Sequence, residues 1–177
     1  MKKSFMLFVL VGIVFLNACT MGRPMGGRPI FNDDDYWADV QIAQVLSAIS
    51  NNDKECLKAM FSKRALAEAY NFDKGIEYVF NLIEGNKISL ERTGLSGEST
   101  MTDGRRSDVV RSIHRLITDK DEYMIIILAY RRDTFNPDNV GIYTLRIIRT
   151  EYRDTYFTTW SQMKIAGIFI PEFYVYE

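Results

Sequence analysis

The stretches "YMIIILAYR" (residues 123–131) and "IYTLRIIRT" (residues 142–150) decide the fold of this chain. Both are rich in β-branched and aromatic residues and are apolar on both sides, which is typical of strands at the centre of a sheet. Between them, "NPDNVG" (residues 136–141) supplies residues that favour a turn. We therefore expect two neighbouring central strands that are covered on at least one side.

Further strands are expected before and after this pair. Upstream, residues 87–95 indicate a first strand and residues 107–118 a second. The polar stretch "GLSGESTMTDG" (residues 94–104) lies between them and is expected to form a long hairpin loop. Downstream, "YFTTWSQMKIAGIFI" (residues 156–170) predicts one or two last strands, which Pro171 ends.

The N-terminal half of the chain has helical periodicity instead. Residues 36–50 predict a helix whose outer side carries Asp39, Gln41 and Gln44. The carboxylates of Asp33–Asp35 precede it, and we expect them to complement the helix dipole. Their spacing lacks the alternating oxygen ligands and the glycine of a calcium loop. The apolar residues at helical spacing are Ala38, Ile42, Val45, Leu46 and Ile49.

Two further helices follow, with a shorter one between them. "NNDKECLKAMF" (residues 51–61) predicts a helix capped by Asn52, with Glu55 completing a capping-box-like pair. Residues 73–84 predict the next helix, which Gly85 stops. The short helix between them is indicated by Ala65, Leu66 and Ala69.

Helices followed by a meandering antiparallel sheet predict an α+β fold, in which a curved sheet wraps around a layer of helices. We expect one domain over residues 34–177, because this length supports a single hydrophobic core.

The first residues have the layout of a secretory signal. Lys2 and Lys3 give a positive start, residues 5–16 form an apolar run, and small Ala18 precedes Cys19. The apolar run is too short for a stable transmembrane helix, which needs about 20 residues.

The sequence Leu16-Asn17-Ala18-Cys19 resembles the bacterial lipobox, in which a peptidase cuts before a cysteine that carries lipid. The resemblance implies a signal peptide over residues 1–18, cleavage between Ala18 and Cys19, and a lipidated Cys19 at the start of a flexible tether, residues 19–33. Acyl chains such as palmitate would then anchor an exported protein to membrane lipid at the extracytoplasmic face of the cell membrane. The alternative is an ordinary cleaved signal with Cys19 near the cut by chance.

Charge and cysteine content exclude several classes of protein. Loss of residues 1–18 removes two lysines and leaves 20 basic against 23 acidic residues, a mature net charge of −3. No basic cluster exceeds an arginine pair, and each pair lies beside acids, so nucleic acid is not an expected partner. Cys56 is the only cysteine besides Cys19, so the mature domain forms no internal disulfide, and a buried inert thiol is the favoured interpretation.

Several stretches resemble a known family of small bacterial lipoproteins, the domain of unknown function 5104. They are "SNNDKECLKAMFS", "IEYVFNLIEG", "DEYMIIILAY" and "NPDNVGIYTLRI", and the resemblance covers about residues 35–150. It implies a cystatin-like fold related to nuclear transport factor 2, a cone with a pocket between helices and sheet. That fold group includes isomerases, dehydratases, hydroxylase subunits and binding modules, so the fold alone does not assign an activity.

His114 is the only histidine, which leaves no histidine pair for a metal and no Ser-His-Asp triad. On its strand it shares a side with Val110, Ser112 and Leu116, so it can line the cone, either as a packed residue or as a general base. The chain has no phosphate-loop, dinucleotide or serine-hydrolase motif, and we expect neither a cofactor nor a metal.

Arg146 interrupts an apolar side of a central strand. It either holds an anionic ligand in the cone or pairs with an acid such as Glu91 across the sheet. An Asp base with a Tyr oxyanion donor, of the ketosteroid-isomerase kind, needs no histidine, but the sequence does not identify such a pair.

These observations favour an exported lipoprotein whose domain binds a small ligand or an envelope protein without catalysis. The alternative is an isomerase- or dehydratase-like enzyme with a carboxylate/tyrosine pair in the cone. A pocket that holds both groups favours the enzyme, and a filled cone with an exposed apolar patch favours a protein partner. A homodimer formed through the open sheet face is a further expectation.

Overall fold

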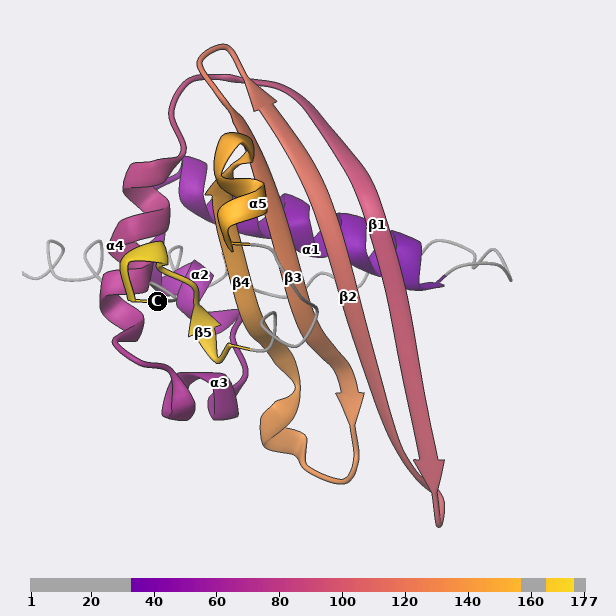
Figure 1. The fold of residues 1–177 in the computed structure, drawn as a ribbon. Coiled ribbons are helices and arrows are strands. Elements are labelled where there is room, and N and C mark those ends of the chain that lie inside the picture. The colour runs from indigo at the N-terminus through magenta and orange to yellow at the C-terminus, as the bar shows by residue number, and fades with distance from the viewer. Residues whose placement is uncertain (1–32, 157–164, 174–177) are drawn as a thin grey trace, which may run out of the picture.

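The computed structural model describes residues 33–156 and 165–173. The expected signal peptide, Ala18, Cys19 and almost all of the tether lie outside these residues. The described chain is an α+β domain in which helices come first and a sheet follows, as predicted (Figure 1). The helices are α1 (Asp33–Ser50), α2 (Lys54–Ala59), α3 (Lys63–Glu68), α4 (Phe72–Leu82) and the short α5 (Arg153–Tyr156).

The sheet has five strands in the order β1-β2-β3-β4-β5, and this arrangement is consistent with the cystatin-like expectation. Its first four strands are antiparallel neighbours, with β3 and β4 in the interior of the sheet as expected. The last strand is only two residues long and pairs parallel to β4, with Gly167 beside Thr144 and Ile168 beside Leu145. The strands are β1 (Lys87–Thr102), β2 (Arg105–Thr118), β3 (Glu122–Asp133), β4 (Gly141–Arg149) and β5 (Gly167–Ile168).

The first hairpin differs from the prediction. Residues 94–104 were expected to form a loop, but they continue β1 in register with β2 as far as Thr102 opposite Arg105. Only Asp103 and Gly104 turn the chain, both with positive φ, the conformation that a two-residue hairpin requires. The prediction was wrong because residues 96–102 are exposed on both faces of the strand and mostly polar, so they show no alternating pattern.

The predicted cap of the second helix is also one residue early. Asn52 has a φ of 53° and turns the chain, and the carboxylate of Asp53 accepts a hydrogen bond of 2.9 Å from the Cys56 N–H. The short helix α3 forms where it was expected, and the Ser62 hydroxyl caps it by accepting from the Ala65 N–H at 3.0 Å.

The two faces of the sheet are covered by different parts of the chain. Side chains alternate along β3, so Ile125 and Ile127 face the helices while Ile126 faces the other way, and all three are buried. Figure 1 shows α1 crossing behind the sheet, while α5 lies in front of it. No helix in the described residues is long and apolar enough to span a membrane.

Tyr123 of β3 connects the sheet to the end of α4. Its buried ring belongs to the core, and its hydroxyl donates to the Leu82 carbonyl at 3.1 Å and accepts from the Glu84 N–H at 3.0 Å. The Leu82 carbonyl is one of those that the end of α4 leaves without a partner inside the helix, and the Glu84 N–H lies just beyond that end. Tyr123 therefore sets where α4 ends against the sheet.

We expect Tyr123→Phe to lower the free energy of unfolding by about 1–2 kcal/mol, because it removes both hydrogen bonds and keeps the ring. The matched control is Tyr152→Phe, since Tyr152 is exposed. Urea denaturation measures both variants, and equal stability of the two would contradict this role of Tyr123.

Candidate functional site

Two hollows lie between α1 and the first strands of the sheet. The larger, about 360 Å³, is here called the His114 groove and is lined by Asp39, Ile42, Leu90, Arg92 and His114. Asp39 and Ile42 come from α1, Leu90 and Arg92 from β1, and His114 from β2. Because β1 is the edge strand, this groove lies at the free edge of the sheet.

Arg92 holds α1 against β1 at this groove. Its Nη1 donates to the Asp35 carbonyl at 2.8 Å and to Asp39 Oδ1 at 2.6 Å, and its Nη2 pairs with the Asp35 carboxylate. Asp35 and Asp39 are four residues apart and therefore lie on the same side of α1. Asp39 is exposed, as expected for the outer side of the helix, although it also meets this cation of the sheet. The expectation was wrong for Gln41, which is buried, because helical periodicity does not show how much of the helix the sheet covers.

His114 lies directly opposite Arg92 in the β1–β2 pairing. Its side chain is only 1% exposed, and its Nε2 is buried with no hydrogen-bond partner among the described residues. Its neighbour on β3 is the apolar Ile125. A buried polar atom without a partner is costly, and in a native protein it often marks a site that a ligand or water completes.

Burial lowers the pKa of His114 to about 4. The negative charge of Asp39 acts in the opposite direction and the positive charge of Arg92 in the same direction, but both effects are smaller than that of burial. The imidazole is therefore neutral at physiological pH and adds no positive charge to the groove.

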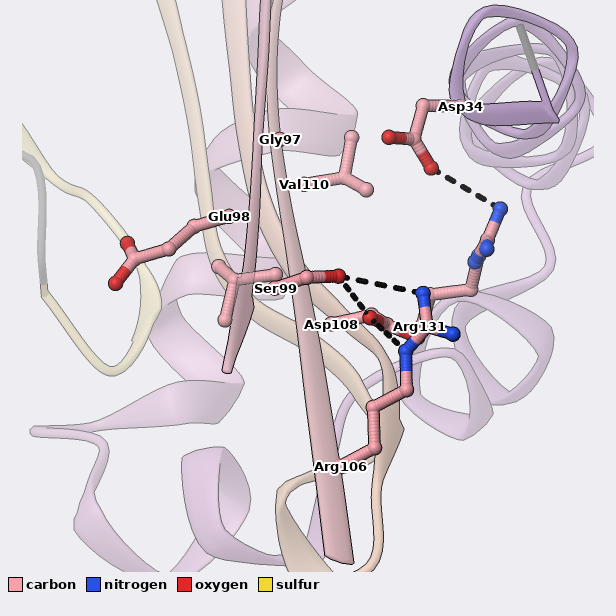
Figure 2. A pocket seen from close by; sticks show the side chains of 9 residues that line it. Asp34, Gly97, Glu98, Ser99, Arg106, Asp108, Val110 and Arg131 are labelled. Carbon is pink, nitrogen blue, oxygen red and sulfur yellow. Dashed lines mark hydrogen bonds and ion pairs between the residues drawn. The ribbon is translucent and has the colours of Figure 1, made fainter. Parts of the chain in front are cut away.

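The second hollow, about 250 Å³, is here called the arginine hollow, and Figure 2 shows it from close by. Arg131 and Asp34 point toward one another in it, and Arg106 points toward Ser99 and Asp108. Arg131 Nη1 lies 2.9 Å from Asp33 Oδ2 and 3.0 Å from Asp34 Oδ1. The first-turn carboxylates of α1 thus sit where the helix dipole favours them, as expected, and two of them also pair with β3.

Asp108 is buried in the arginine hollow and is surrounded by donors. Burial alone would raise its pKa, but hydrogen bonds from Ser99 and Arg106, with the charges of Arg106 and Arg131, hold the pKa below its usual value. Arg132 Nε lies 3.7 Å from the second oxygen of Asp108, which is buried and has no hydrogen-bond partner in the described part of the chain. The charges of this hollow are thus paired with one another, although this one oxygen is left without a hydrogen bond. The paired charges suit a clamp between α1 and the sheet better than a ligand site.

Arg146 lines neither hollow. It lies opposite Ile126, on the face of the sheet away from His114 and Ile125. Its guanidinium stacks on the ring of Phe169 at 4.0 Å, and Nη1 donates to the Tyr156 carbonyl at 2.8 Å. The predicted pairing with Glu91 was wrong, because that residue is on β1, three strands away from β4.

The two hollows bear on the enzyme alternative as well. Neither is lined by a tyrosine, so neither holds the carboxylate/tyrosine pair that this alternative requires. Over residues 33–156 and 165–173, no three His, Cys, Asp or Glu side chains are grouped as metal ligands.

The comparisons with known proteins give the family. A family model described as "Domain of unknown function (DUF5104)" matches residues 44–150, which is more than half of the chain. The chain therefore belongs to this family, as the sequence resemblance predicted. No curated protein sequence matches it.

The pH dependence of stability tests the neutral state of His114. Its pKa is about 4 in the folded protein and 6.5 ordinarily, so the unfolded chain binds the proton more readily. The contribution of the neutral His114 to the free energy of unfolding is therefore full above pH 6.5 and is lost as the pH falls toward 4. Between pH 7.5 and 5 we expect wild type to lose about 2 kcal/mol of unfolding free energy relative to His114→Gln. Urea denaturation at both pH values measures this, and identical pH dependence of the two proteins would contradict it.

A second prediction concerns Arg146. We expect Arg146→Ala to lower the unfolding free energy by about 2–3 kcal/mol, because it removes a buried cation–π contact and a charged hydrogen bond. Arg105→Ala, at an exposed position beside the β1–β2 turn, is the control. Thermal and urea unfolding compare the two, and a loss no larger than that of the control would show that the contacts of Arg146 add little stability.

Proposed function

We propose that this protein is an exported lipoprotein, anchored to the cell membrane through lipid on Cys19, whose domain binds a small ligand in the His114 groove without catalysing a reaction. The observation that carries the binding part is that an open groove is lined by His114, whose Nε2 is buried and has no partner among the described residues. A ligand that hydrogen-bonds this atom would offset the cost of its burial.

The sequence before the domain supports the location. A positive start, a short apolar run, a small residue and a cysteine occur together in the order of a lipoprotein signal. Two acyl chains on one cysteine meet the two-signal requirement for stable membrane attachment. The stretch between Cys19 and α1 is rich in glycine and proline, which suits a tether.

A small ligand is favoured over a protein partner by the surface of the domain. The groove is open and lies within the usual size range of small-molecule sites. Within residues 33–156 and 165–173, the large apolar side chains that are exposed are spread over several elements and connections of the fold. They are Tyr36, Tyr70, Ile88, Met101, Phe135, Val140 and Tyr152.

Binding is favoured over catalysis by the state of the charged groups in the groove. Arg92 has both terminal nitrogens engaged by α1, and Asp39 already accepts one of its hydrogen bonds. The imidazole has a pKa well below neutrality, which makes it a weak base. These groups suit recognition and the positioning of α1.

The anchor is tested by feeding an alkyne-labelled palmitate to the native host. We expect label on the wild-type protein and on Cys56→Ser, the matched control at the other cysteine, and none on Cys19→Ser. Mass spectrometry of the wild-type N-terminus then identifies the lipid. An unlabelled wild-type protein, or a labelled Cys19→Ser variant, would overturn the anchor.

The binding part is tested by NMR on the imidazole of the only histidine, which needs no assignment. The full chain, purified without a histidine tag and held in a nonionic detergent, is screened against a library of small charged and neutral fragments. We expect some fragments to shift the His114 resonances saturably. Failure of every fragment to do so would count against a ligand site here.

A further inference from the structure

We infer that the His114 groove recognises the ammonium group of a small organic amine, held between Asp39 and His114, with its apolar part against Ile42 and Leu90. This inference rests on the proposed function and names the class of ligand. The hydrogen bonds, charges and lining of the groove carry it.

Carboxylates outnumber cations around Arg92. This residue pairs with both Asp35 and Asp39, of which Asp39 lines the groove. The imidazole of His114 is neutral, so it adds no positive charge. A cationic ligand beside Asp39 would therefore be attracted, whereas an anion there would be repelled.

Arg92 is poorly placed to bind an anion. Its Nη1 donates to the Asp35 carbonyl and to Asp39, and its Nη2 pairs with the Asp35 carboxylate. A guanidinium binds a carboxylate or phosphate strongly when two of its N–H groups face the ligand together. The fork of Arg92 is instead directed at α1, which fixes the distance between the helix and β1.

Two acceptor positions remain for a ligand. Asp39 is 59% exposed at its side chain, and only its Oδ1 has a partner within the described part of the chain, which leaves Oδ2. The other position is His114 Nε2, which accepts a hydrogen bond when the imidazole carries its proton on Nδ1. An ammonium group has donors for both and strengthens each bond by its charge.

The rest of the lining suits a short hydrocarbon chain. Ile42 is buried and belongs to the core, and Leu90 packs against that core from the edge strand. Both side chains line the groove beside the polar pair. An amine with a few methylene groups would therefore satisfy the polar atoms and cover apolar surface with the same molecule.

The test compares three probes of equal length, n-butylammonium, butyrate and 1-butanol, on the full chain in nonionic detergent at pH 7.5. The His114 resonances report binding. We expect n-butylammonium to shift them saturably with an affinity at least tenfold higher than that of either other probe. The same spectra should show the free imidazole with its proton on Nδ1.

Two variants supply the controls. Asp39→Asn keeps an oxygen for Arg92 but removes the negative charge. It should weaken the binding of n-butylammonium at least tenfold and leave the affinity for 1-butanol unchanged. Asp73→Asn changes an exposed carboxylate on α4, away from the groove, and should leave all three affinities unchanged.

Each other outcome overturns the inference. Butyrate or 1-butanol binding as tightly as the amine would keep the groove as a ligand site but reject the ammonium class. A proton on Nε2 in the free protein, or equal n-butylammonium affinity in Asp39→Asn, would reject the named contacts. If none of the three probes binds, the amine inference fails, and the fragment screen decides separately whether the groove binds any ligand.

Discussion

The structure depends on two central strands that must be buried on both faces. Ile125, Ile126 and Ile127 follow one another in β3, and all three are inaccessible to solvent although they point alternately to opposite sides. Helices cover one side, and the C-terminal part of the chain covers β4 on the other, where Phe169 meets Arg146. The cost of leaving either apolar face in water explains why an irregular C-terminal segment returns to the sheet.

At the edge of the sheet, ion pairs join the strands to α1. Arg92 joins β1 to α1, and Arg131 joins β3 to the first turn of the same helix. These pairs hold the N-terminal half of α1 over strands that have few apolar residues to offer it, and the two hollows lie between them. In the proposed function, the contacts of Arg92 would set the width of the groove and leave two carboxylates beside this one cation.

Some features of the fold and of the groove could be predicted from the sequence, and others could not. The two apolar runs were correctly predicted as the central strands β3 and β4, because β-branched and aromatic residues dominate them. Alternation along β2 put His114 on the same side as Leu116, which belongs to the core. The residues that line the groove together with His114 were not predicted. Asp39 and Arg92 are far apart in sequence, and each looks like an ordinary surface charge, so no local pattern shows that folding brings them together at one groove.

The sequence by itself determined the order of helices and strands, the burial of the central pair and the membership of the family, because periodicity and composition are local properties. It also supplies the whole argument for the lipid anchor. The tertiary structure alone decided that Arg146 packs on the C-terminal segment, that β5 runs parallel to β4, and that His114 is buried with an unpartnered nitrogen. Each of these depends on contacts between residues distant along the chain, and such contacts follow from how the elements pack.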